Sequence, residues 1–468
     1  MTKLHDMARD SDVANSSSEG VSRRDFLVRT GQVAGGLVAV SSLGTLAGAL
    51  GAEDTVEAAN IPGAPVIPRL SISFGIGPYV DHSYWIIGVR KGWFKEVGIT
   101  LTPGPAGRSS LPDTWGPALI SHTVDIQSAS ESHYLPSMKT ARNLRQLLWT
   151  DLFQGFAVLV QPDEGLKSAS QLIAQGQSAS QAVYNAIRQL KGRKLLFAPE
   201  AGERSFVEAV LKKGGMSLKD VSYTEIQDAN QVPLMVTHRA DAQVSGVPIR
   251  LTLQEKGFKV LVSAADLVKT AKPSASSPEL LTVFRDGAAT TEQWYTAHQD
   301  AALRLTSVVF RITQLINTNP NQANAIQRPF VNSIAGTALS PKLVNVAYNA
   351  LDPFYTYQKQ RTWYEDPSSP FYYKYEFGAY IDSWVSKGLF KKGELTVDEL
   401  ALNAHIYKEL ETLQKQSASL INTTARRIHA KGGQHGNAAK LLQQARVYYS
   451  HFNFLDAWRF AKAASTKV

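Results

Sequence analysis

Short apolar segments alternate with longer amphipathic segments through the first two thirds of this 468-residue chain. Leu70–Phe74 alternates between apolar and polar residues, as half-buried strands do, and Phe156–Val160 is the continuous apolar run of a buried strand. Between such runs, apolar residues recur at helical spacing, as they do from Trp85 to Phe94. Strands that alternate with helices predict α/β lobes with mostly parallel sheets.

The same pattern predicts further elements along the chain. Asp81 is placed to cap the helix through Trp85, Pro248 is placed to start another, and residues 165–189 hold an additional helix. From Glu292 onward the pattern is nearly all helical. Further strands are expected at Ile99–Thr102, Val124–Ile126, Lys194–Ala198, Val221–Ile226, Ala242–Val244, Val260–Val262 and Leu280–Phe284.

Two features stand out in the helical part. Residues 354–384 hold twelve aromatic side chains, which suit packing between helices, with the rim of a ligand cleft or a partner surface as the alternative. Residues 421–468 hold eight Lys or Arg and one acid, Asp456. That bias predicts a solvated basic helical surface, or a surface that contacts anionic lipid or a partner.

The N-terminal region has the pattern of an export signal. Arg23 and Arg24 precede an uncharged run rich in Gly and Ala, and small residues at 47–49 offer a cleavage site. This arrangement predicts a twin-arginine signal peptide over residues 1–58, with a retained membrane anchor as the alternative. The protein is therefore expected to fold before export and to act in the periplasm.

Composition narrows the possible chemistry. The chain has no cysteine, which excludes disulfides, thiolate metal sites and cysteine nucleophiles. Residues 1–58 hold five Lys or Arg and eight Asp or Glu, which leaves 44 against 32 in the rest of the chain. The positive charge is spread out, and no nucleic-acid partner is expected.

Motifs for nucleotide binding and catalysis are missing from the chain. Gly75-Ile76-Gly77 follows a strand but lacks the third glycine of a dinucleotide fingerprint. His429 and His435 are too far from carboxylates in sequence to indicate a metal site. No enzyme activity, cofactor or metal is therefore expected.

Four segments resemble the periplasmic substrate-binding proteins of the aliphatic sulfonate, taurine and nitrate ABC-transporter type. They are Gly88–Ile99, Ala118–Ile126, Leu190–Leu195 and Arg239–Ala242, which occur in the order and at the spacing of that family, within residues 69–399. The resemblance implies a two-lobe α/β fold of type II, with mixed, mostly parallel sheets and two crossover strands, here Phe156–Val160 and Leu281–Phe284.

The resemblance also implies domain limits and a role. Lobe I would comprise residues 69–157 and 282–399, lobe II residues 158–281, and residues 400–468 would form a basic helical extension. The protein would be a monomer that captures a small organic or anionic solute between its lobes and delivers it to a membrane permease. The alternatives are a twin-arginine-exported enzyme with an unrecognised site and a membrane-tethered interaction protein.

Loops at the carboxyl ends of predicted strands are where open α/β sheets bind ligands. We expect aromatic side chains there to stack on the solute, hydroxyls to donate hydrogen bonds, Arg204 to pair with an anionic group, and acids to hold a positive or donor group. Because acids outnumber cations in these loops, a zwitterionic, amine-bearing or heteroaromatic ligand is as open as a sulfonate. The predicted ligand-binding residues are Tyr79, His82, Tyr84, Trp85, Ser128, Ser130, Glu131, Arg204, Ser205 and Asp228.

Overall fold

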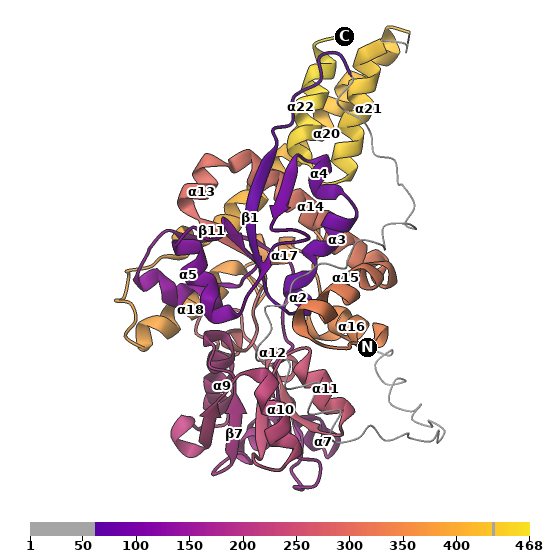
Figure 1. The fold of residues 1–468 in the computed structure, drawn as a ribbon. Coiled ribbons are helices and arrows are strands. Elements are labelled where there is room, and N and C mark those ends of the chain that lie inside the picture. The colour runs from indigo at the N-terminus through magenta and orange to yellow at the C-terminus, as the bar shows by residue number, and fades with distance from the viewer. Residues whose placement is uncertain (1–60, 433–435) are drawn as a thin grey trace, which may run out of the picture. The chain divides into compact units, whose positions relative to one another are not determined.

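The computed structural model describes residues 61–432 and 436–468 (Figure 1). All the described residues belong to one compact unit. The predicted signal peptide over residues 1–58 lies outside the described residues. Within the described residues, no helix is both long enough and apolar enough to cross a membrane.

The first sheet belongs to lobe I and has the strand order β2-β1-β4-β11-β5, with β3 paired to β1. Strand β1 pairs in parallel with β2, β3 and β4, whereas β11 runs antiparallel to both β4 and β5. Ile72 and Phe74 of β1 are fully buried, as the alternating pattern predicts. The strands are β1 Leu70–Ile76, β2 Ile99–Thr102, β3 Arg108–Ser109, β4 Ile126–Gln127, β5 Leu144–Trp149 and β11 Gly287–Thr291.

The second sheet belongs to lobe II and has the order β10-β6-β9-β7-β8. Its strand β7 is parallel to β8 and β9, and β6 is antiparallel to β9 and β10. All four residues of β6 are buried, which explains its continuous apolar run. The strands are β6 Ala157–Val160, β7 Lys194–Phe197, β8 Ser222–Glu225, β9 Ala242–Ser245 and β10 Lys259–Ser263.

Helices cover both sheets, and the predicted α/β fold with two lobes is confirmed. Residues 165–189 hold two helices, α7 and α8, where one was predicted. The helices around lobe I are α2 Val80–Ser83, α3 Trp85–Arg90, α4 Trp93–Glu96, α5 Trp115–Ile120 and α6 Glu131–Tyr134, with 3-10 turns at Pro112–Thr114 and Leu135–Lys139. Those of lobe II are α7 Ala169–Ala174, α8 Ala179–Arg188, α9 Ala201–Lys213, α10 Asp228–Val236, α11 Ile249–Glu255 and α12 Ala264–Val268, with a 3-10 turn at Leu218–Asp220.

In the described residues after β11, the regular elements are helices joined by loops, as predicted. Half of the aromatic side chains of residues 354–384 are buried, and Tyr355, Tyr364, Phe371 and Tyr373 pack partly buried against the core, so most of this segment serves core packing. The buried ones are Phe354, Tyr357, Trp363, Phe377, Tyr380 and Trp384. The helices are α13 Glu292–Ala297, α14 Gln299–Thr318, α15 Pro320–Ala335, α16 Pro341–Val346, α17 Arg361–Tyr364, α18 Tyr373–Ser386 and α19 Val397–Leu400, with a π-helical turn at Ala347–Leu351.

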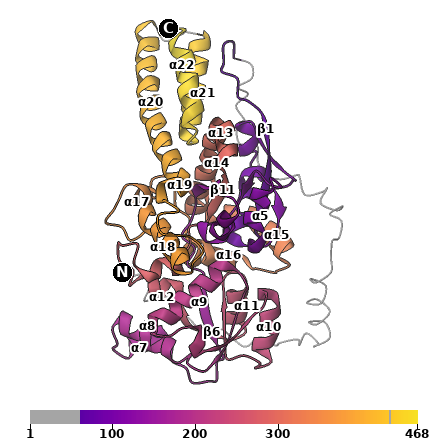
Figure 2. The ribbon, with the colours of Figure 1, turned by 90° about the vertical axis from the view of Figure 1, so that its left-hand side faces the viewer.

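The last three helices form the predicted extension. Helix α20 (Leu402–Ala430) packs against α21 (Gly436–Ser450) and α22 (Phe454–Ser465), and Figure 2 shows the three side by side. They enclose a separate apolar cluster that includes Leu441, Ala445 and Phe460. The N-terminal part of α20 packs on β5, so the extension is continuous with lobe I. Whether its basic surface meets lipid or a partner stays a prediction.

Two local predictions need correction. Leu280–Phe284 is not a strand: Pro278 fixes the start of a 3-10 helix, η7, at Pro278–Thr282. The strand of this region is β11, which begins with Gly and two Ala and lacks the large apolar residues by which the other strands were predicted. Asp81 does not cap a long helix, because the chain breaks there into α2, α3 and α4, and Asp81 lies inside α2.

The chain passes between the sheets at residues 150–156 and 283–286. The two passes pair through an antiparallel bridge between Phe153 and Phe284. Each pass overlaps one end of a segment that was predicted as a crossover, Phe156–Val160 or Leu281–Phe284. The rest of the first segment, residues 157–160, instead forms β6 of the second sheet. The exact division into lobe I, lobe II and extension stays a prediction.

Candidate functional site

A cavity lies where the two sheets meet, and both lobes contribute to its wall. Its lining comes from the loops that follow β1, β7 and β9, from the start of the 3-10 turn at Pro112–Thr114, from α6 and from both crossings. The lobe I side and the crossings contribute Tyr79, Asp81, His82, Leu111, Pro112, Asp113, His133, Phe153, Phe156, Phe284 and Asp286. The lobe II side contributes Ala198, Pro199, Glu200, Glu203, Gln227, Gly246 and Val247.

The position of the cavity follows from strand direction. Strands β1, β7 and β9 end at Ile76, Phe197 and Ser245, and the next residues of each loop reach the cavity. Ligands of open α/β sheets bind outside the carboxyl ends of the strands, so the cavity occupies the expected place. This agrees with the loop positions from which the site was predicted.

Asp81, His82 and Asp286 form a buried group in the wall of the cavity. His82 Nε2 lies 3.2 Å from Asp286 Oδ1 and 4.0 Å from Asp81 Oδ2. Burial raises the pKa of Asp81 to about 8. Burial opposes charge on the other two groups, but Asp286 raises the pKa of His82, and His82 lowers the pKa of Asp286. These shifts favour a proton on Asp81 beside a charged pair of His82 and Asp286.

Ser128 fixes the orientation of the His82 ring. His82 Nδ1 donates to Ser128 Oγ at 3.0 Å, and Trp85 Nε1 donates to the same oxygen at 3.2 Å. The Ser128 hydroxyl donates in turn to the carbonyl of Gly287 at 3.2 Å. With every hydrogen bond of the hydroxyl in use, the imidazole is held with Nε2 directed at Asp286.

A second histidine meets a carboxylate across the cavity. His133 of lobe I lies with Nε2 3.5 Å from Glu200 Oε2 of lobe II, and its Nδ1 lies 2.8 Å from Ser130 Oγ. Glu200 also caps α9, because its Oε1 accepts from the backbone N–H of Glu203 at 2.9 Å. The contact between His133 and Glu200 therefore joins the two lobes at the N-terminus of α9.

The cavity has an acidic lining. Asp81, Asp113, Glu200, Glu203 and Asp286 line it, and within the described residues no Lys or Arg does. Among the described residues, the basic side chains in the wall are His82 and His133, each within 3.5 Å of a carboxylate. A bound group of negative charge would therefore meet carboxylates without a matching guanidinium or ammonium.

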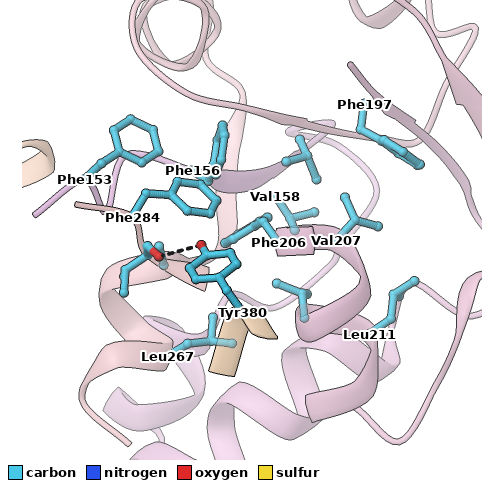
Figure 3. Close-up of a cluster of buried hydrophobic side chains, with 14 of the residues drawn as sticks. Phe153, Phe156, Val158, Phe197, Phe206, Val207, Leu211, Leu267, Phe284 and Tyr380 are labelled. Carbon is cyan, nitrogen blue, oxygen red and sulfur yellow. Dashed lines mark hydrogen bonds between the residues drawn. The ribbon is translucent and has the colours of Figure 1, made fainter. Parts of the chain in front are cut away.

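Aromatic rings form the apolar part of the wall at the crossings (Figure 3). Phe153 and Phe284 stack with centroids 5.9 Å apart, and Phe156 meets Phe153 edge-on at 4.8 Å. Behind them the Tyr380 hydroxyl donates to the carbonyl of Val283 at 3.3 Å. The crossings thus combine a hinge position with an aromatic surface that faces the cavity.

Of the predicted ligand-binding residues, Tyr79 and His82 line the cavity. Tyr84 and Trp85 are fully buried and stack on each other with centroids 4.9 Å apart, outside the lining. Ser128 is also fully buried and supports His82 instead of reaching a ligand. Tyr84 and Trp85 lie behind the wall, because they pack into the apolar core of lobe I.

The other predicted residues lie away from the lining. Ser130 caps α6 and hydrogen-bonds to Ser132, and Glu131 is fully buried and accepts from Trp149 Nε1 at 3.3 Å. Arg204 pairs with Glu208 and Glu225 on the surface of α9, and Ser205 is buried within that helix. Asp228 begins α10, and its side chain lies outside the described part of the chain.

Sequence reasoning missed most of the wall. Asp81 was interpreted as a helix cap, and Asp286 follows a segment that was interpreted as a strand. His133 and Glu200 come from different lobes, so no local spacing joins them. The one signal that could have found Asp286 is an Arg-Asp pair directly after the apolar crossing, where a buried strand rarely carries charge.

Comparisons with known proteins support the fold. No protein-family model and no curated protein matches the chain. The sulfonate-binding protein SsuA from Methylobacillus flagellatus KT is 13% identical, with 74% of this chain and 96% of that chain covered and a TM-score of 0.51. The nitrate-binding protein NrtA from Synechocystis PCC 6803 is 12% identical, with 73% and 88% covered and a TM-score of 0.50.

The desulfurization enzyme DSZB is 10% identical, with 73% of this chain and 99% of that chain covered, and its TM-score is lower, at 0.46. At such identities a shared architecture establishes the fold and leaves the ligand open. The resemblance seen in the sequence segments is thus confirmed for the architecture. The chain has the two-lobe, periplasmic-binding-protein-like fold of the sulfonate- and nitrate-binding proteins.

Proposed function

We propose that this protein is an extracytoplasmic solute-binding protein that captures a small molecule between its two lobes. The observation that carries the proposal is the cavity at the junction of the two sheets, with a wall built from both lobes. The solute-binding role of SsuA and NrtA, which share the fold, supports it.

Closure of the lobes would complete the site. Two chain passes join the sheets, at residues 150–156 and 283–286, and hinge motions are absorbed by a few such residues. Contacts across the cavity, such as the one between His133 and Glu200, would then favour the closed state. Measured affinity would include the equilibrium between open and closed forms.

The acidic lining argues for a solute that is neutral, zwitterionic or amine-bearing rather than a simple sulfonate or nitrate. Glu200, Glu203 and Asp113 would repel an anion, and like charges brought together in an interface cost several kcal/mol. An ammonium group would meet carboxylates, and the rings of Phe153 and Phe284 offer cation–π or stacking contacts. Tyr79 and His82 are the predicted contact residues that the cavity retains.

The proposal includes a partner and a compartment. The loaded protein, acting as a monomer, would deliver its solute to an ABC-transporter permease, and residues 22–27 would direct the folded chain to the periplasm through the twin-arginine pathway.

An exported enzyme is the second candidate, and one observation favours it. Two histidines, each beside a carboxylate, face the same cavity, which is an arrangement that acid–base catalysts use. A solute that is recovered unchanged after prolonged incubation with the protein would favour the receptor, and a converted solute would favour the enzyme.

A thermal-shift screen tests the proposal. The full chain is heated with taurine, other sulfonates, nitrate, amino acids, amines and pyrimidines, and a true ligand raises the melting temperature with concentration. We expect amines or zwitterions to stabilise the protein more than sulfonates or nitrate do. Stabilisation by sulfonates alone would contradict the proposed ligand class.

Lobe closure can be measured directly because the chain has no native cysteine. Ser121→Cys in lobe I and Lys191→Cys in lobe II introduce two exposed labelling sites, and energy transfer between dyes on them reports lobe separation. A stabilising solute should shorten the distance between the dyes. A solute that binds tightly while the distance stays constant would contradict capture by closure.

A further inference from the structure

The group of Asp81, His82 and Asp286 has the donor atoms and spacing of a metal site. The three residues are at most 4% exposed, and one ligand atom from each lies within 4.8 Å of the others. Asp81 and His82 come from α2, whereas Asp286 comes from the crossing before β11. Two parts of lobe I that are distant in sequence therefore place three donors at one point of the cavity wall.

The distances suit a small divalent ion. Metal–ligand distances of about 2.0–2.1 Å in a tetrahedral site place ligand atoms about 3.3 Å from one another. The separations of His82 Nε2 from Asp286 Oδ1 and from Asp81 Oδ2 are 3.2 Å and 4.0 Å. A contraction of less than 1 Å on the Asp81 side would bring both separations into that range.

A buried acceptor supports a bound ion independently of the spacing. Asp286 Oδ1 is inaccessible to solvent, although the side chain lines the cavity. His82 Nε2 lies 3.2 Å from it, and the Asp81 carboxyl also contacts Asp286. A buried carboxylate needs a compensating charge, and a cation held between these three side chains would supply it.

The surroundings of His82 are those of a metal-binding histidine. Nε2 is directed at the two carboxylates, while Nδ1 donates to Ser128 Oγ, which is itself fixed by Trp85 and Gly287. Histidines that bind metals through one nitrogen usually donate the other to an anchored acceptor, which sets the tautomer and the ring angle.

We propose that Asp81, His82 and Asp286 bind one divalent transition-metal ion, with Zn²⁺ or Mn²⁺ as the best matches. A set of one imidazole nitrogen and two carboxylate oxygens suits these ions, whereas Ca²⁺ and Mg²⁺ prefer oxygen ligands alone. Three protein ligands leave at least one coordination position, and it would face the cavity. This replaces the sequence-based expectation that the chain binds no metal.

Calorimetric titration of the untagged full chain, stripped with a chelator, tests the proposal. Zn²⁺ or Mn²⁺ should bind with a 1:1 stoichiometry, and Mg²⁺ should bind far more weakly. Loss of a partner that only orients a ligand costs 10–100-fold in affinity, so Ser128→Ala should weaken binding by that factor. His82→Gln and Asp286→Asn each remove a ligand and should weaken binding by more than about 100-fold.

Two matched variants serve as controls. His298→Gln removes a histidine at the end of α13, outside the cavity, and Asp113→Asn removes a carboxylate that lines the cavity outside the group. Both should bind the metal as the wild type does. Circular dichroism of each metal-free variant verifies that it is folded, and Ser128→Ala provides a second readout if a ligand variant fails to fold.

The same titration can also contradict the metal site. If the three residues form only an ion pair, the wild type will not bind Zn²⁺ or Mn²⁺, or the affinity will not change in His82→Gln and Asp286→Asn. Either result overturns the metal site. It would leave the proposed solute binding intact, because the thermal-shift screen and the dye distances measure that separately.

Discussion

Arg285 and Asp286 are neighbours in the chain, but they belong to two very different buried groups. Arg285 is fully buried, pairs with Glu376 and lies over the rings of Trp149 and Trp363, with centroids 4.3 and 5.3 Å away. Its charge is therefore matched by a carboxylate and enclosed by aromatic rings, with no residue of this group in the cavity lining.

Asp286 faces the opposite way, into the cavity, where carboxyl groups outnumber the cations. The comparison separates two uses of a buried charge. A charged pair that is enclosed away from the cavity stabilises the fold, whereas a charged group in the cavity wall can meet a ligand. The passage from one environment to the other takes a single residue, because successive side chains of extended backbone point to opposite sides.

The largest effect on stability is expected from the enclosed group. Arg285→Met leaves Glu376 buried without its partner, and breaking such a pair by removing one member costs about 3–5 kcal/mol. Urea unfolding measures the loss as a lower midpoint. The double variant Arg285→Met with Glu376→Leu should regain most of it, since an apolar pair can replace a buried ion pair. A single variant as stable as the wild type would contradict the structural role.

A partly exposed pair should show an intermediate effect that depends on pH. Glu279 of η7 accepts from Lys213 Nζ of α9 at 2.5 Å and from Ser277 Oγ at 2.6 Å. Burial opposes ionisation, but these bonds outweigh it and lower the pKa of Glu279 below 4.5. Glu279→Gln should therefore lose about 1.5–3 kcal/mol at pH 7.

The direction of this pH dependence follows from the difference between the folded and unfolded pKa values of Glu279. Because the native pKa is below the unfolded one, this stabilisation is present above pH 4.5 and disappears as the pH falls through the native value. Chemical unfolding measures the free energy of unfolding of the wild type and of Glu279→Gln. The difference between the two should be larger at pH 7 than at pH 3. A difference that is equal at both pH values would exclude the ionised Glu279 as its source.

The smallest effect is expected from Arg204, an exposed residue. Its guanidinium pairs with Glu208 and Glu225 on the surface of α9, and exposed ion pairs contribute between about 0.2 and 1 kcal/mol. Arg204→Ala should therefore change the free energy of unfolding by no more than about 1 kcal/mol. It should leave the affinity for any solute found in the screen unchanged. A tenfold loss of affinity would restore the sequence-based assignment of Arg204 to the site.

The sequence predicted the architecture better than the site. The order of apolar and amphipathic segments is a property of each element alone, and strands such as β1, β6 and β7 carry it plainly. Strand β11 could not be predicted this way, because Gly287–Thr291 consists of small residues that pack between β4 and β5 in a close-fitting sheet.

The site depends on tertiary contacts that leave no local pattern. Tyr79 and His82 were found because they follow β1, but Ser128 reaches His82 across 46 residues of chain and Asp286 across 204. Tyr84 and Trp85 follow the same strand and face the core instead. Position after a strand therefore predicts the neighbourhood of a site, and the direction of each side chain decides its role.

Anomalous diffraction at the zinc edge from crystals of the zinc-loaded full chain tests most directly whether the cavity group, and not its enclosed neighbour, binds the ligand. We predict one peak between Asp81, His82 and Asp286, and none beside Arg285 and Glu376. Absence of a peak between those three residues, or a peak elsewhere only, would contradict the account.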